Sequence, residues 1–119
     1  MLYIGIDLGT SATKFLLVDE SGKILNSISK DYPVIYPKSV WSEQNPEEWW
    51  NAVKTGVPEL LNGFDGADVK GIGVAGQMHG LVVLDDNDNV IRNVILWNDG
   101  RTWKETDYLN IEVGKDKLS

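Results

Sequence analysis

The residues nearest the start of the chain have the types and spacing needed to hold a metal-bound phosphate. Asp7 ends an apolar run, Gly9 follows it closely, and Lys14 lies in the next apolar run, with hydroxyl side chains in between. Glycine lets the backbone approach phosphate oxygens, hydroxyls donate hydrogen bonds, a carboxylate can hold Mg²⁺, and lysine supplies a point charge. An ordinary β-hairpin with Gly9 in its turn fits the same residues, so both interpretations stay open here.

A second cluster, residues 76–80, places Gln77, Met78 and His79 between two glycines at the junction of two apolar runs. Such a junction between strands can present polar groups into a cleft, because glycine in a strand often marks the close approach of a ligand. A single histidine can instead satisfy a nearby backbone carbonyl, and that alternative is kept for His79. The chain has no cysteine and His79 is its only histidine, so a zinc site is not expected.

A third cluster, residues 97–101, combines the aromatic face of Trp97 with an amide, the carboxylate of Asp99 and the guanidinium of Arg101. Aromatic planes can stack on the C–H faces of a sugar while neighbouring polar groups bond its hydroxyls. The alternative is a strand end, a turn and a helix start with Asp99 as the cap.

Hydrophobic spacing predicts the elements that position these clusters. Asn45 is a good N-cap and Pro46 suits the first helical position, while Pro58 should kink the helix or divide it within residues 54–57. The expected strands are 2–7, 12–19, a weaker one over 24–32, 69–75 and 94–97; the expected helices run from 46 to about 62 and onward from 101; residues 33–45 are expected to form an extended loop.

The overall composition of the chain excludes some classes of function. The chain has 119 residues and a net charge of −7, and its 11 lysines and arginines are scattered, which argues against nucleic acid and anionic membranes as partners. Without cysteine it has no disulfide or thiolate chemistry. No leader and no membrane-spanning run is recognised, so a cytoplasmic protein is the expectation.

The acidic cluster at residues 85–89 begins like a calcium loop but departs from that pattern. Val90 stands where the loop needs its glycine, and Leu96 stands where the bidentate acid belongs. A hairpin turn between residues 81–84 and 90–91 is therefore predicted. The order of strands, helix, strands and helix indicates an α/β or α+β fold with a mixed sheet that opens with a three-stranded antiparallel meander.

Several segments together resemble one family. They are residues 4–11 with Lys14, residues 41–46 followed by Trp49 and Trp50, residues 76–80, and residues 96–101. They are similar to the amino-terminal part of the FGGY carbohydrate kinases, and residues 76–80 and 97–101 resemble the xylulokinase branch of that family. These kinases lie within the superfamily of actin, hexokinase and Hsp70 ATPases. The resemblance therefore implies an α/β, ribonuclease-H-like domain.

The resemblance also implies roles for individual residues. Asp7 would assist Mg²⁺ in catalysis, and the first hairpin would contact the phosphates of ATP. Met78 and His79 would contact the ketose, and they argue against glycerol because glycerol-type relatives carry an arginine and a glutamate there. The implied phosphate-side residues are Gly9, Thr10, Thr13 and Lys14, and the weaker implied sugar contacts are Gln77, Trp97, Asp99 and Arg101.

The implied reaction is transfer of the ATP γ-phosphate to D-xylulose, giving D-xylulose 5-phosphate, with ATP and Mg²⁺ as cofactors. Family members are far longer and carry their general base well after residue 119. Residues 1–119 are therefore expected to be a partial amino-terminal FGGY kinase domain that lacks the carboxy-terminal lobe and is inactive alone. The alternatives are a kinase for ribulose, gluconate or a polyol, and a non-catalytic sugar-binding module. The expected partners are the sugar and ATP, with a homodimer as an option.

Overall fold

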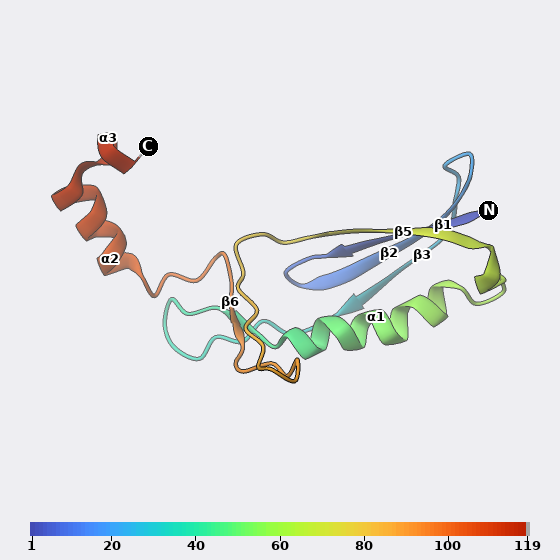
Figure 1. Cartoon of the computed structure of the whole chain (residues 1–119), viewed down its shortest axis with the longest axis horizontal. Coiled ribbons are helices and arrows are strands. Elements are labelled where there is room, and N and C mark those ends of the chain that lie inside the picture. Colours follow the sequence, from blue (N-terminus) through green and yellow to red (C-terminus); the bar gives the residue numbers. More distant parts are fainter. Residues whose placement is uncertain (119) are drawn as a thin grey trace.

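A four-stranded mixed sheet forms the body of the computed structural model, which describes residues 1–118. Its strands are β1 (Leu2–Leu8), β2 (Ala12–Asp19), β3 (Ile24–Asp31) and β5 (Val69–Gly76), in the order β3-β2-β1-β5. The first three strands pair antiparallel and β5 pairs parallel to β1. The expected meander and mixed sheet are thus confirmed, and Figure 1 shows the long strands lying side by side above helix α1.

Helix α1 (Pro46–Leu60) begins where the sequence predicted. The side chain of Asn45 accepts a hydrogen bond from the backbone N–H of Glu47, at 3.1 Å, so it satisfies one of the free amides of the first turn. The expected division of the helix near residues 54–57 is wrong, because the helix is continuous through Pro58. Pro58 removes only its own N–H bond to the carbonyl four residues earlier, and only two helical residues follow it.

The core lies between α1 and one face of the sheet. Phe15, Leu17 and Leu60 are completely buried there, and Gly56 of α1 lies directly against the Phe15 ring. Alternation along each strand places every second side chain on the opposite face, which no helix covers in the part of the chain that is described. Leu16 is exposed on that open face. Ile72 and Val74 of β5 pair with Ile4 and Ile6, so they lie on the face of the core, and they are exposed because α1 packs mainly on β2 and β3.

A second, two-stranded sheet forms from segments far apart in the sequence. Strand β4 (Glu43–Gln44) pairs antiparallel with β6 (Val94–Ile95). The expectation of a continuous loop over residues 33–45 is therefore wrong at its end, and the strand expected over 94–97 is shorter. A strand of two residues is too short for a hydrophobic pattern to predict it. Strand β4 is defined only by its pairing with β6.

The acidic cluster forms the predicted hairpin turn. The Asp85 carboxylate accepts backbone hydrogen bonds from Asn87, at 2.8 Å, and Asn89, at 2.9 Å, and residues Leu84 and Val90 form an isolated antiparallel bridge. These bonds lower the pKa of Asp85, with the contacts to Asn89 as the largest cause. Among the described residues, no group of three or more acidic or histidine side chains could hold a metal ion.

The helical stretch expected after residue 101 is present. It consists of α2 (Trp103–Tyr108), a π-helical turn (Leu109–Gly114) and α3 (Lys115–Leu118), and these elements contact mainly one another. Figure 1 shows them projecting away from the sheet. The radius of gyration is accordingly 18.7 Å, against about 13.5 Å for a compact chain of this length. None of the described helices is long and apolar enough to cross a membrane.

Replacing Gly56 by alanine tests the packing of α1 on the sheet. A Cβ at this position would lie 2.6 Å from Cζ of the buried Phe15 ring, so the core must expand or the helix must shift. We expect Gly56→Ala to lower the free energy of unfolding by about 1–3 kcal/mol, although alanine is the better helix former. Urea denaturation measures this, with Thr55→Ala on the exposed side of the same helix as the control, which should be close to neutral. A stabilised Gly56→Ala would contradict the packing described.

Candidate functional site

A carboxylate and a lysine face each other across the first hairpin. Asp7 of β1 and Lys14 of β2 are directly opposite in the antiparallel register, and both are exposed on the open face of the sheet. Residues directly opposite in such a pair lie on the same face. They line a cavity of about 470 Å³ whose walls are Gly5, Ile6, Asp7, Lys14, Leu16, Gly73, Val74 and Ala75.

The turn between these strands depends on Gly9. A Cβ there would lie 2.9 Å from the carbonyl oxygen of Ala12, which already accepts a hydrogen bond from the Gly9 amide. The neighbouring Thr13 is completely buried on the face opposite to Lys14, and its hydroxyl donates to the Tyr32 hydroxyl at 3.3 Å. Tyr32 in turn donates to the Gly9 carbonyl, and burial raises its pKa. Thr13 therefore supports the turn from beneath and does not line the cavity beside Asp7.

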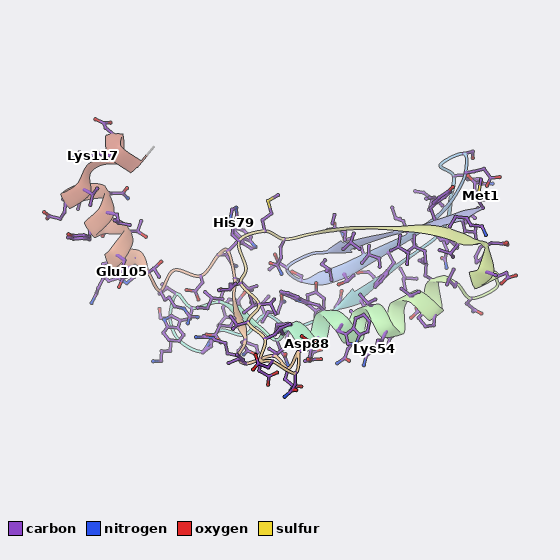
Figure 2. The ribbon with its side chains drawn as sticks, viewed as in Figure 1. Met1, Lys54, His79, Asp88, Glu105 and Lys117 are labelled. Atoms are coloured by element: carbon purple, nitrogen blue, oxygen red, sulfur yellow. The ribbon has the colours of Figure 1, made fainter. Side chains whose placement is uncertain are left out.

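A second cavity, of about 390 Å³, lies where β5 ends, and its walls are Gly76, Gln77, Met78, His79 and Trp97. Met78 is 74% exposed and Trp97 is 59% exposed, so their apolar surfaces face this space. His79 is exposed and has φ of 63°, a left-handed conformation uncommon for a residue with a side chain. Figure 2 shows His79 beyond β5, well away from Lys54 on α1 and Asp88 in the acidic turn.

The parallel pairing of β5 with β1 brings the two cavities together. Gly76 pairs with Leu8, and the Gln77 amide donates to the Leu8 carbonyl at 2.8 Å. The Thr10 hydroxyl donates to Oε1 of Gln77 at 3.1 Å and accepts from Nε1 of Trp97, also at 3.1 Å. Three segments that the sequence singled out separately thus meet at one hydroxyl group.

Asp99 and Arg101 form a separate, mostly buried cluster. Arg101 donates from Nε to Oδ1 and from a terminal nitrogen to Oδ2 of Asp99, both at 2.8 Å, and to Glu43 at 2.7 Å. Its guanidinium stacks 3.7 Å from the ring centre of Trp41, and the Ser42 amide donates to Asp99 at 2.6 Å. The hydrogen bonds from Arg101 hold the pKa of Asp99 far below its usual range. These two residues therefore tie the 97–101 segment to the 41–43 segment and do not line the cavity of Trp97.

Comparison with known proteins identifies the family of this chain. Residues 2–119 match the amino-terminal domain of the FGGY family of carbohydrate kinases. The chain belongs to this family. The xylulose kinase of Escherichia coli (strain K12) is 42% identical over 117 residues, which are 98% of this chain and 24% of that protein. The chain thus spans about a quarter of the length of the curated relatives it matches.

Solved structures of FGGY kinases share the fold. A ligand-bound xylulose kinase from Lactobacillus acidophilus is similar with a TM-score of 0.90 and 32% identity, covering 98% of this chain and 24% of that one. A gluconate kinase from the same organism gives a TM-score of 0.87 and 31% identity, covering 99% of this chain and 24% of that one. The fold class and the family expected from the sequence are therefore confirmed.

One residue of the site was missed by sequence reasoning. Gln44 of β4 is completely buried and connects the Thr10 carbonyl to Gln77 and to the Trp49 indole. It lies within a segment that carried the resemblance to FGGY kinases, but a glutamine just before a helix cap looks like a surface residue. Its immediate neighbours, Glu43 and Asn45, are polar as well, so no local pattern marked it as buried.

Replacing Asp99 by asparagine should destabilise this FGGY domain in a pH-dependent way. An amide cannot make the charged pair with Arg101, so we expect Asp99→Asn to lower the free energy of unfolding at pH 7 by about 2 kcal/mol. Because the pKa of Asp99 is lowered in the folded state, the pair contributes its full stability above the unfolded pKa. That contribution shrinks as the pH falls from the unfolded pKa toward the much lower folded pKa, so the free energies of unfolding of the two proteins should draw together progressively below about pH 4.

Urea denaturation at neutral and acidic pH measures this difference. Asp107→Asn, at an exposed position on α2, is the matched control and should change stability little at either pH. A constant difference between Asp99→Asn and the parent across the pH range would contradict the charged pair.

Proposed function

We propose that the protein containing this chain is an ATP-dependent kinase that phosphorylates D-xylulose to D-xylulose 5-phosphate. The observation that carries the proposal is the junction at Thr10, which holds the Asp7 turn against the cavity of Gln77 and Trp97. A kinase needs phosphate and sugar hydroxyl aligned within reach of each other, and two neighbouring cavities connected through the hydrogen bonds of Thr10 suit that arrangement. The xylulose kinase names of the most similar relatives support the choice of sugar.

The Asp7 side of the site fits a magnesium-bound phosphate. Mg²⁺ keeps several waters and takes one or two carboxylates together with substrate phosphates, so one exposed carboxylate facing a lysine suits it. In this proposal Asp7 holds Mg²⁺, which neutralises charge on the phosphates, while Lys14 and the turn at Gly9 and Thr10 adjoin the phosphate chain. Met78, His79, Gln77 and Trp97 surround the sugar.

The proposed reaction is in-line attack of the terminal sugar hydroxyl on the γ-phosphorus. The new O–P bond forms as the bond to the β–γ bridging oxygen breaks, ADP leaves, and the hydroxyl proton passes to a general base. The described walls of the cavity of Met78, His79 and Trp97 include no carboxylate. By resemblance to the FGGY kinases, the base would come from a part of the protein beyond residue 119. We place the kinase in the cytoplasm, where ATP is available.

Much apolar surface of this chain suits a further part of the same protein. Ile72 and Val74 on β5 are 59% and 67% exposed, and Ile111 in the projecting helical segment is 75% exposed. Patches of this kind mark surfaces that other structure covers. We propose that residues 1–119 are part of the amino-terminal domain of a two-lobed kinase, and a homodimer is the alternative occupant of these surfaces.

The direct experiment is ADP release by the full-length protein with Mg-ATP and a panel of sugars. We expect turnover with D-xylulose to exceed that with D-ribulose, D-gluconate and glycerol by at least about tenfold in kcat/KM. Preference for another sugar would retain the kinase but overturn the assignment of the cavity at Met78 and His79. No turnover with any sugar, together with saturable quenching of tryptophan fluorescence by D-xylulose, would instead indicate a non-catalytic binding module.

Asp7→Asn tests the phosphate side of the site separately. Removing the negative charge weakens the hold on Mg²⁺, so we expect kcat in the full-length kinase to fall by about 100-fold or more, with little change in sugar binding. Coupled measurement of ADP release gives kcat, and titration of tryptophan fluorescence gives the sugar affinity. Asp31→Asn, an exposed carboxylate at the end of β3, is the matched control and should keep full activity. An active Asp7→Asn protein would exclude a role for this carboxylate in catalysis.

A further inference from the structure

A buried glutamine lies behind the sugar cavity without lining it. Gln44 has no exposed surface, whereas Gln77, Met78, His79 and Trp97 form the cavity walls. We infer that Gln44 is a positioning residue of the sugar site, holding Gln77 directly and Trp97 through Thr10. This inference rests on the proposed sugar kinase function and adds a residue that touches neither sugar nor phosphate.

The hydrogen bonds of Gln44 use its full capacity. Its Nε2 donates to the carbonyl oxygens of Thr10, at 2.6 Å, and Pro33, at 3.3 Å. Its Oε1 accepts from Nε1 of Trp49, at 2.9 Å, and from Nε2 of Gln77, at 3.1 Å. A primary amide has two donor hydrogens and two acceptor lone pairs, so no capacity remains unused.

The direction of each hydrogen bond is forced by its partners. An indole N–H only donates and a backbone carbonyl only accepts, so Trp49 and the two carbonyls together allow one orientation of the Gln44 amide. Gln77 must then donate to Gln44 and turn its own oxygen toward Thr10. The Thr10 hydroxyl must donate to that oxygen, which leaves its lone pair to accept the N–H of Trp97.

The two-stranded sheet of β4 and β6 holds both ends of this series of hydrogen bonds in place. Gln44 pairs with Val94 across the β4–β6 ladder, and the Leu96 amide donates to the Ser42 carbonyl at 3.0 Å, directly before Trp97. The Trp97 ring is therefore fixed by its backbone on one side and by Thr10 on the other. Removing the Gln44 amide would free Gln77 and the Thr10 hydroxyl to adopt other partners, because their orientations would no longer be unique.

Gln44→Leu in the full-length protein is the first test, with Asn26→Leu as the matched control. The Asn26 side chain also donates a hydrogen bond to a backbone carbonyl, that of Leu60, at 3.0 Å. It lies at the other end of α1 from the cavity. We expect Gln44→Leu to raise the KM for D-xylulose by about tenfold or more while the KM for ATP changes less, and Asn26→Leu to alter neither.

A spectroscopic measurement reports the same effect without catalysis. In protein labelled with ¹⁵N-tryptophan, the Trp97 indole N–H signal, identified with Trp97→Phe, should shift in Gln44→Leu and stay in place in Asn26→Leu. Trp97 is separated from Gln44 by two side chains, so a shift shows that the orientation is passed along them. An unmoved Trp97 signal, an unchanged KM for the sugar, or an equal effect of Asn26→Leu would each overturn the inference.

Gln44→Glu supplies a second test, which can be used if the Gln44→Leu variant folds poorly. None of the groups that bond the Gln44 amide titrates near neutral pH, and the adjacent Glu43 is paired with Arg92 and Arg101. Burial and the two facing carbonyls should raise the pKa of a glutamate here, and only its protonated form can donate to Thr10. Relative to the parent, the variant should therefore regain sugar affinity as the pH falls from about 8.5 to about 5.5.

If the ratio of the sugar affinities of Gln44→Glu and the parent did not change with pH, the positioning role would be overturned. The two hypotheses fail in different ways. If the parent protein phosphorylates no sugar, the proposed function fails, and the Trp97 signal still decides whether Gln44 orients the cavity. If the parent is an active sugar kinase and the Gln44 variants behave like Asn26→Leu, the function stands and the positioning role is excluded.

Discussion

Parallel pairing of β5 with β1 is the constraint on which the rest of the site depends. Both strands run toward the same edge of the sheet, so Asp7 and the segment after Gly76 arrive side by side although about 70 residues of chain separate them. The antiparallel pair β1–β2 adds Lys14 opposite Asp7 at that edge. Strand direction alone therefore places the cavity of Asp7 and Lys14 next to the cavity of Gln77 and Trp97 before any side chain has contributed specificity.

Buried polar contacts then determine how these cavities are oriented. Among the described residues a helix covers only one face of the four-stranded sheet. Residues 42–44, which lie beside the turn at Thr10, carry Glu43 and Gln44 into the interior. Each finds several partners: Glu43 pairs with Arg92 and Arg101, and Gln44 bonds both the turn at Thr10 and Gln77. If either side chain were buried without a partner, its burial would lower the stability of the fold. The arrangement in which both are paired is therefore favoured, and it holds the surrounding loops in place.

The sequence predicted those parts of the fold whose information is local. Alternating apolar residues predicted β1 and β2, and the N-cap at Asn45 predicted the start of α1. Strand β4 was missed because its partner lies some 50 residues away and its own two residues carry no pattern. For the same reason Asp99 and Arg101 looked like sugar contacts: their types suited the role, but only folding revealed that they satisfy each other.

Residue type and spacing by themselves determined the family, the mixed sheet with its opening meander, and the chemistry available to this chain: a carboxylate, a lysine, a histidine and an aromatic face. Tertiary structure alone decided which of these groups share a cavity. It turned Thr13 inward and Lys14 outward, joined Thr10 to Gln77 and Trp97, and placed Gln44 behind them. The physical reason is that hydrogen-bond partners and burial depend on contacts between distant segments, and a linear pattern records only near neighbours.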